Sequence, residues 1–140
     1  PAGWCTCCSQ AGFHYTSTRT NLPRDTYPAL ARAIDVLVYN GDWDACVPYT
    51  DNEAWTTGMG FPVQAAGGAW HPWAYDPAAP LAAGAGAQVG GYATVYAVPG
   101  AANASSFSFI TVRGGRHEVP ETAPFKALAM IKRFTSGEGF

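Results

Sequence analysis

The chain has 140 residues and a formal net charge of −2, with 48% hydrophobic and 13% charged residues. Such a composition is typical of a globular domain, and the lack of net positive charge argues against a nucleic-acid-binding protein. No apolar run approaches the roughly 20 residues of a membrane-spanning helix. The start at Pro1 shows neither the basic residues nor the apolar stretch of a signal peptide, as expected of a mature or processed chain. We therefore expect no nucleic-acid and no membrane partner.

Four cysteines bear on the compartment: Cys5, Cys7, Cys8 and Cys46. They lack the second cysteine or histidine pair that completes a four-ligand zinc site, so we expect no metal. Disulfides in a secreted or vesicular protein are the better interpretation. Neighbouring cysteines cannot easily bridge one another. Since only Cys46 lies elsewhere in the chain, the cluster indicates a partner chain.

A possible glycosylation site agrees with a secretory compartment. Asn103-Ala104-Ser105 matches the acceptor triplet for N-linked glycans, and it lies in a stretch of small polar residues typical of a surface loop. Such triplets also arise by chance, so the match alone is weak support.

The first elements in chain order are an irregular segment, a helix and a strand. Residues 1–24 are rich in Cys, Ser and Thr and are expected to be irregular, as a cysteine-containing connecting segment. Residues 25–33 can form a short helix that tolerates Pro28 near its start. Residues 34–40 are apolar and β-branched, which predicts a strand buried on both faces in a parallel sheet.

The middle of the chain combines a helix with a segment of low complexity. Residues 50–59 are predicted to be helical, with Thr50 and Glu53 forming a capping box. Residues 65–91 consist largely of Ala, Gly and Pro around a few aromatic side chains. Because Gly and Ala bury little surface, we expect an irregular insert there.

The last third of the chain predicts two strands and a helix. Residues 89–98 alternate like a half-exposed strand, and residues 107–113 form a clearer one. Residues 121–135 are the strongest helix, which Gly137 can end. One helical stripe carries its apolar side chains: Ala123, Ala127, Met130, Ile131 and Phe134.

Polar loops follow two of these strands, one with Asp42 and Asp44 and the other with His117. Ligands bind at the carboxyl ends of strands in open α/β sheets, so these groups should meet at one edge. An Asp can hold an imidazole in the required tautomer, and a His can accept a proton near neutral pH. Each alone also has a structural explanation, a turn for the aspartates and a carbonyl-bonded loop residue for the histidine.

Asp followed by His, each after a strand, is the end of the α/β-hydrolase order Ser, Asp or Glu, His. The run VLVYNGDWDACVP resembles the aspartate segment of the serine carboxypeptidases, and FSFITVRGGRHEVPETAP resembles their histidine segment. WCTC, HPWAYD and VGGYATVY fall where that family carries similar stretches. The resemblance extends from Trp4 to the final helix.

The resemblance implies an α/β fold: the C-terminal part of an α/β-hydrolase, with a mostly parallel sheet and flanking helices. Residues 1–140 would be one part of a single catalytic domain, with 1–24 as a connecting segment and 65–91 as an insert. This part would be incomplete without an N-terminal partner chain.

By matching position, the resemblance makes Asp44 the triad acid and His117 the general base, and leaves Asp42 a structural role. The reaction implied is release of C-terminal amino acids from peptides through an acyl-enzyme, with no metal or organic cofactor. The alternatives are a carboxypeptidase-like acyltransferase, a hydroxynitrile lyase, or a non-catalytic member with a decayed site.

The resemblance also assigns residues around the triad. Cys46 resembles a cysteine found unpaired beside the substrate site in some members, and Glu118 would line the leaving-group pocket and favour basic C-terminal residues. A solvated charge at a helix start is an equal explanation for Glu118. Cys7 resembles the cysteine that binds this part to the rest of the fold, with Cys8 as the alternative.

A nucleophilic serine on a G-x-S-x-G turn is missing from this sequence. No serine here has that context: Ser9, Ser17, Ser105, Ser106, Ser108 and Ser136. The resemblance therefore implies a disulfide-linked N-terminal large chain that carries the serine, a peptide substrate and, for the assembled enzyme, a possible homodimer. The expected location is secreted, vacuolar or lysosomal.

Overall fold

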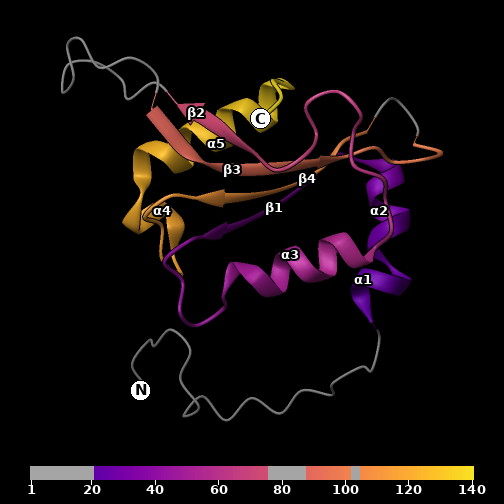
Figure 1. Cartoon of the computed structure of the whole chain (residues 1–140), viewed down its shortest axis with the longest axis horizontal. Helices are drawn as coiled ribbons and strands as arrows, with labels where there is room; N and C mark the ends of the chain where they lie inside the picture. Colours follow the sequence, from indigo (N-terminus) through magenta and orange to yellow (C-terminus); the bar gives the residue numbers. More distant parts are fainter. Residues whose placement is uncertain (1–20, 76–87, 102–104) are drawn as a thin grey trace, which may run out of the picture.

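A mixed four-stranded sheet organises the chain (Figure 1). The computed structural model describes residues 21–75, 88–101 and 105–140. The strands are β1 (Val36–Gly41), β2 (His71–Tyr75), β3 (Gln88–Tyr96) and β4 (Phe107–Val112), in the spatial order β1-β4-β3-β2. Among the described residues, no helix has the length and apolar character to cross a membrane.

The expectation of a mostly parallel sheet is wrong for this part of the chain. β1 pairs with β4 in parallel, whereas β4 with β3 and β3 with β2 are antiparallel. The short connection from β3 to β4 explains the difference, because a parallel pair needs a crossover of a dozen or more residues. The fold is nevertheless α/β, with helices beside the sheet.

In the described part of the chain, five helices flank the sheet: α1 (Leu22–Asp25), α2 (Tyr27–Ala33), α3 (Tyr49–Gly58), α4 (Val119–Thr122) and α5 (Pro124–Ser136). The single helix expected over 121–135 is divided at Ala123, whose φ is −138°, because a proline disfavours helical geometry in the residue before it. Gly137 ends α5 with φ 74°, as predicted.

The predicted capping box of the middle helix is wrong. α3 begins at Tyr49, one residue early, and Pro48 at its N-cap provides no side-chain hydrogen bond. Thr50 and Glu53 therefore lie inside the helix and not at the cap positions. The spacing of Thr50 and Glu53 predicted a helix that starts at a Thr cap, but the φ of −58° at Pro48 lets the helix begin directly after it.

Two apolar layers hold the helices to the sheet. On the α5 side, Trp73, Ile110 and Met130 belong to one buried cluster. On the opposite side, which α2 and α3 cover, Phe107 and Phe109 belong to another. Every residue of β4 is buried. Figure 1 shows α5 and α3 on opposite sides of the sheet, with β4 in the interior of the strand order.

β1 is less buried than its sequence predicted. It lies at the edge of the described sheet, its apolar residues are only half-buried, and Tyr39 is 41% exposed. The apolar run predicted a strand buried on both faces, and among the described residues β4 alone pairs with it.

The segment 65–91 is more regular than expected, because residues 71–75 form β2 and residues 88–91 begin β3. Trp73 is buried, and its indole N–H donates to the carbonyl of Thr111 at 2.9 Å. A Cβ on Gly90 would stand 2.4 Å from the Trp73 ring, and one on Gly91 would stand 1.8 Å from the Thr111 oxygen. These glycines permit close packing, and do not indicate an irregular chain.

Several sequence predictions concern residues outside the described ranges. Cys7, Cys8 and Asn103 lie there, as does most of the segment 1–24.

Candidate functional site

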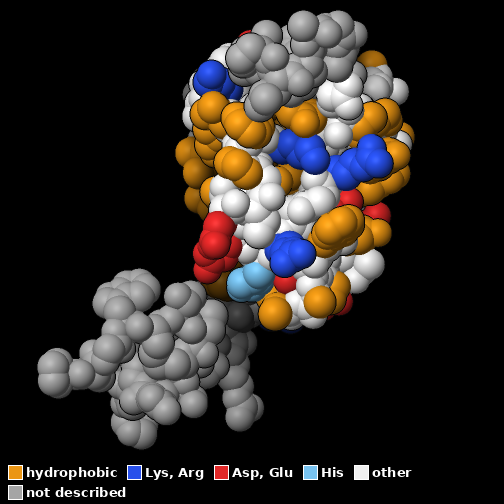
Figure 2. Space-filling model, turned by 90° about the vertical axis from the view of Figure 1, so that its left-hand side faces the viewer, with side chains coloured by type: hydrophobic (Ala, Val, Ile, Leu, Met, Phe, Trp, Pro, Cys, Tyr) orange, Lys and Arg blue, Asp and Glu red, His pale blue; other side chains and the backbone are white. Residues whose placement is uncertain are grey.

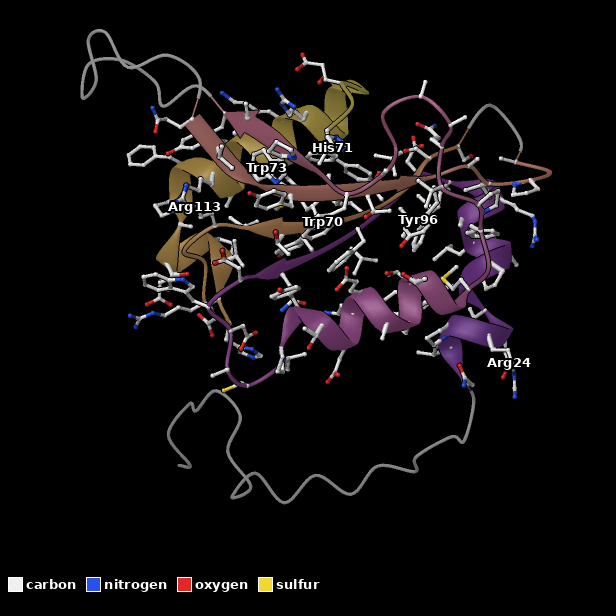
Figure 3. All side chains as sticks on the ribbon, viewed as in Figure 1. Arg24, Trp70, His71, Trp73, Tyr96 and Arg113 are labelled. Atoms are coloured by element: carbon white, nitrogen blue, oxygen red, sulfur yellow. The ribbon has the colours of Figure 1, made fainter. Side chains whose placement is uncertain are left out.

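The parallel pairing of β1 with β4 brings two polar loops to one edge of the sheet. Gly41 at the end of β1 lies opposite Val112 at the end of β4. In Figure 3, Arg113 marks this edge, and Tyr96 lies toward the opposite end. The carboxyl ends of parallel strands are where α/β sheets place their ligands.

Backbone hydrogen bonds join the two loops directly. Trp43 N–H donates to the Gly115 carbonyl at 2.9 Å, and Gly114 N–H donates to Asp42 Oδ1 at 2.6 Å. A carboxylate that accepts a backbone N–H in this way stabilises the turn it joins. In the structure Asp42 thus binds one loop to the other.

The loops approach so closely that Gly41 has no room for a side chain. A Cβ on Gly41 would stand 2.2 Å from the carbonyl oxygen of Gly115 and 2.6 Å from that of Arg116. Only a residue without a Cβ lets the two backbones meet at this distance. Gly41 therefore sets the separation of the loops that carry Asp44 and His117.

Asp44 and His117 are brought together by this approach. Nδ1 of His117 lies 2.9 Å from Oδ2 of Asp44. The Asp44 side chain is 4% exposed, whereas that of His117 is 48% exposed. The second carboxylate oxygen, Oδ1, accepts the backbone N–H groups of Cys46 at 2.8 Å and Val47 at 3.1 Å. Both oxygens of a nearly buried carboxylate are thus satisfied.

These contacts keep Asp44 ionised. Burial acts to raise the pKa of Asp44, but the hydrogen bonds from Val47 N–H, His117 and Cys46 N–H outweigh it, so the pKa lies below its ordinary value of 3.8. An ionised carboxylate can only accept, so Nδ1 of neutral His117 must carry the proton. Nε2 then presents its lone pair outward, and within the described part of the chain it has no hydrogen-bond partner.

The pair opens into a shallow depression of about 220 Å³. Its lining is contributed by Tyr39, Asn40, Gly41, Asp44, Val47, His117 and Val119. Drug-sized ligands usually occupy pockets of about 300–1,000 Å³. The depression is therefore too small to enclose a peptide by itself.

A larger hollow of about 280 Å³ lies away from this edge, with Asp35, Ser106 and Phe140 in its lining. It contains neither Asp44 nor His117. It lies at the amino ends of β1 and β4, where α/β sheets do not usually hold ligands. We therefore take the Asp44–His117 depression as the candidate site.

The other site residues predicted from the sequence lie beside this pair. Cys46 is exposed with a free thiol, and its backbone N–H contacts Asp44. Glu118 is exposed at the start of α4, where its carbonyl accepts the Thr122 hydroxyl at 3.0 Å. On the face shown in Figure 2, a histidine lies among acidic and basic side chains. The lining of the depression itself combines polar side chains with the apolar Val47 and Val119.

Asn40 is a residue of this site that the sequence analysis missed. It is 6% exposed at the end of β1, and its Nδ2 donates to the carbonyl of Val47 at 2.8 Å. Asn52 on α3 donates to its Oδ1. The available signal was a polar residue at the end of an otherwise apolar strand, directly before the Gly41 turn.

Comparison with known proteins identifies one family. A family model described as serine carboxypeptidase matches residues 2–137. The chain is 36% identical over 102 residues to serine carboxypeptidase-like 21 of Arabidopsis thaliana, covering 73% of this chain and 17% of the relative. It is 31% identical over 138 residues to serine carboxypeptidase-like 29 of the same plant, covering 98% and 24%. Serine carboxypeptidase 1 of Hordeum vulgare is 33% identical over 101 residues, covering 72% and 16%. The chain thus spans no more than a quarter of these relatives.

Proposed function

Because this chain belongs to the serine carboxypeptidase family, we propose that it supplies Asp44 and His117 to a Ser-Asp-His triad that releases C-terminal residues from peptides. The observation that carries the proposal is the 2.9 Å contact between His117 Nδ1 and Asp44 Oδ2, on an imidazole that lines the depression and is 48% exposed. An oriented, partly exposed imidazole on a buried carboxylate is the arrangement that activates a serine hydroxyl.

The proposed reaction has two halves. A serine oxygen attacks the carbonyl of the last peptide bond while His117 Nε2 takes its proton, and this proton passes to the departing amino group as the bond breaks. A water molecule then attacks the acyl carbonyl and gives a proton to Nε2. Nε2 passes this proton to the serine oxygen as the acyl–oxygen bond breaks and the shortened peptide leaves as an acid. Asp44 keeps the Nδ1 proton in place and stabilises the imidazolium that forms in each half.

The serine and the oxyanion hole are proposed to come from an N-terminal large chain of the same enzyme, disulfide-linked through Cys7 or Cys8. Two observations support such a partner chain: the open depression of about 220 Å³, and the edge position of β1 beside it in the described sheet. A strand edge with open N–H and C=O groups is stable when another strand or segment covers it. The assembled enzyme is proposed to form a homodimer.

Glu118 and Cys46 are proposed to contact the substrate. Both are exposed beside the pair, and Glu118 follows His117 directly. A carboxylate there would attract a basic departing residue by charge complementarity. We further propose a secreted, vacuolar or lysosomal location. The cysteine cluster and the Asn103 triplet in the sequence support this location, because disulfides and N-linked glycans are typical of secretory compartments.

A fluorophosphonate probe tests the proposal, because it labels only an activated serine. The native protein is labelled and run on non-reducing and reducing gels. We expect the label on a larger species that, on reduction, releases this chain unlabelled. Substitution His117→Ala should abolish labelling, whereas the exposed control Glu121→Gln should not. An unlabelled native protein would contradict the proposed function and favour a non-catalytic member of the family.

A further inference from the structure

A directional chain of side-chain hydrogen bonds leads from α3 to the loop that holds Asp44. Trp55 Nε1 donates to Asn52 Oδ1 at 2.6 Å, and Asn52 Nδ2 donates to Asn40 Oδ1. Asn40 Nδ2 in turn donates to the carbonyl of Val47 at 2.8 Å. Four residues from a helix, a strand and a loop are therefore joined in one line.

The groups at the two ends of this series of hydrogen bonds fix its direction. An indole N–H only donates and a backbone carbonyl only accepts, whereas each amide between them can do both. Trp55 therefore sets the amide of Asn52, and Asn52 sets that of Asn40. Rotating either amide by 180° would place oxygen against oxygen or N–H against N–H. The Asn40 amide is thus locked with its donor toward Val47.

Val47 connects this series of hydrogen bonds to the carboxylate of Asp44. Its carbonyl accepts from Asn40, and its N–H donates to Asp44 Oδ1 at 3.1 Å. The neighbouring N–H of Cys46 donates to the same oxygen at 2.8 Å. The segment that orients Asp44 is exposed at Cys46 and Val47, so packing alone does little to hold it. The side-chain bond from Asn40 to the Val47 carbonyl therefore restrains a part of the loop that packing leaves open.

We propose that Asn40 is a positioning residue for the triad, and that Asn52 and Trp55 lock its amide. The inference rests on the proposed function, since it concerns the geometry of the Asp44–His117 pair. By fixing Val47, Asn40 keeps two backbone donors on Asp44 Oδ1 and leaves Oδ2 aimed at Nδ1 of His117. Asn40 acts through this loop and itself forms no bond with the histidine.

A purely structural role is the competing explanation. The Asn40–Asn52 bond also attaches α3 to β1, so its loss could simply destabilise the protein. The two explanations differ in turnover per intact site. Loss of helix attachment lowers the number of folded molecules, whereas loss of positioning lowers kcat in molecules that remain folded.

The test uses the full-length, assembled enzyme and three variants. Asn40→Leu removes both bonds and keeps the branched shape of the side chain. Trp55→Phe removes only the donor that sets the direction, and keeps a ring against Tyr27, whose centroid lies 5.4 Å away. Thr57→Val is the matched control, because it removes the 3.2 Å bond to the Tyr96 hydroxyl from the same helix without touching the site.

Active sites are counted with a stoichiometric fluorophosphonate, and kcat and KM are measured per site on a peptide substrate. We expect Asn40→Leu to lower kcat about 10- to 100-fold with KM little changed, as misplaced catalytic groups do. Trp55→Phe should lower kcat in the same direction by a smaller factor, and Thr57→Val should leave it unchanged. Parental kcat in both Asn40→Leu and Trp55→Phe would overturn the inference. If Asn40→Leu does not fold, Trp55→Phe decides alone.

The NMR signal of the His117 Nδ1 proton gives a readout independent of turnover. It should shift or broaden in Asn40→Leu and Trp55→Phe and stay in place in Thr57→Val, because it reports the bond to Asp44. An inactive parent enzyme would refute the proposed function, and this signal would still test the role of Asn40. An unchanged signal in both variants would refute that role.

Discussion

Substitution of Gly41 by Ala should push apart the loops that carry Asp44 and His117. The added Cβ would stand 2.2 Å from the Gly115 oxygen, and real Cβ contacts essentially never fall under 3.0 Å. At least about 0.8 Å of movement is therefore required between the loops that carry Asp44 and His117. A displacement of about 1 Å can cost about 100-fold in rate, which corresponds to about 3 kcal/mol of barrier.

The measurement is kcat/KM per titrated active site in the assembled enzyme, together with thermal unfolding. We expect about a 100-fold loss of kcat/KM and a destabilisation of about 1–3 kcal/mol, the usual range for overpacking. Gly58→Ala is the matched control, because a Cβ there meets nothing within 4 Å. Parental activity in Gly41→Ala would refute the reasoning that this glycine sets the loop separation.

Three further predictions concern charge, specificity and packing. Because the pKa of Asp44 is lowered in the folded state, its carboxylate stabilises the native state at pH values above the ordinary pKa of 3.8. This stabilisation is lost as the pH falls from 3.8 through the lower pKa of the folded state. Asp44→Asn should therefore flatten the acid limb of the stability–pH curve from denaturant unfolding, and an unchanged limb would contradict this. Glu118→Gln should reduce kcat/KM for C-terminal Lys relative to Leu by about two- to fivefold, the size of an exposed ion pair, and Glu121→Gln should not. Trp73→Ala should cost about 3–5 kcal/mol in denaturant unfolding, because this ring is 1% exposed, whereas Trp70, at 42%, should cost clearly less.

The sequence predicted the elements of the site better than those of the sheet. The loops with Asp44 and His117 follow β1 and β4 as expected, because apolar strands and polar loop residues are local patterns. Strand direction is not a local pattern, so the antiparallel β3–β4 pair was missed. The break before Pro124 could have been found, since proline restricts the residue that precedes it.

Two misses share a cause, which is contact between residues far apart in the chain. In the sequence, Gly90 and Gly91 indicated an irregular segment, whereas in the structure they pack closely against the Trp73 ring and the Thr111 backbone. Asn40 looked like the end of a strand, and its role depends on Asn52 in a separate helix. Composition and periodicity describe neighbours along the chain and contain no information about such pairs.

The pairing of β1 with β4 also has a kinetic consequence. These strands are separated in sequence by α3, β2 and β3, yet their contact creates the site. Contacts between distant segments carry a larger loop-closure entropy and form slowly compared with helices and hairpins. α3 and the β2–β3 pair can therefore form while Asp44 still lacks its histidine. The contact between Asp44 and His117 should therefore form only in the last, high-contact-order step of folding.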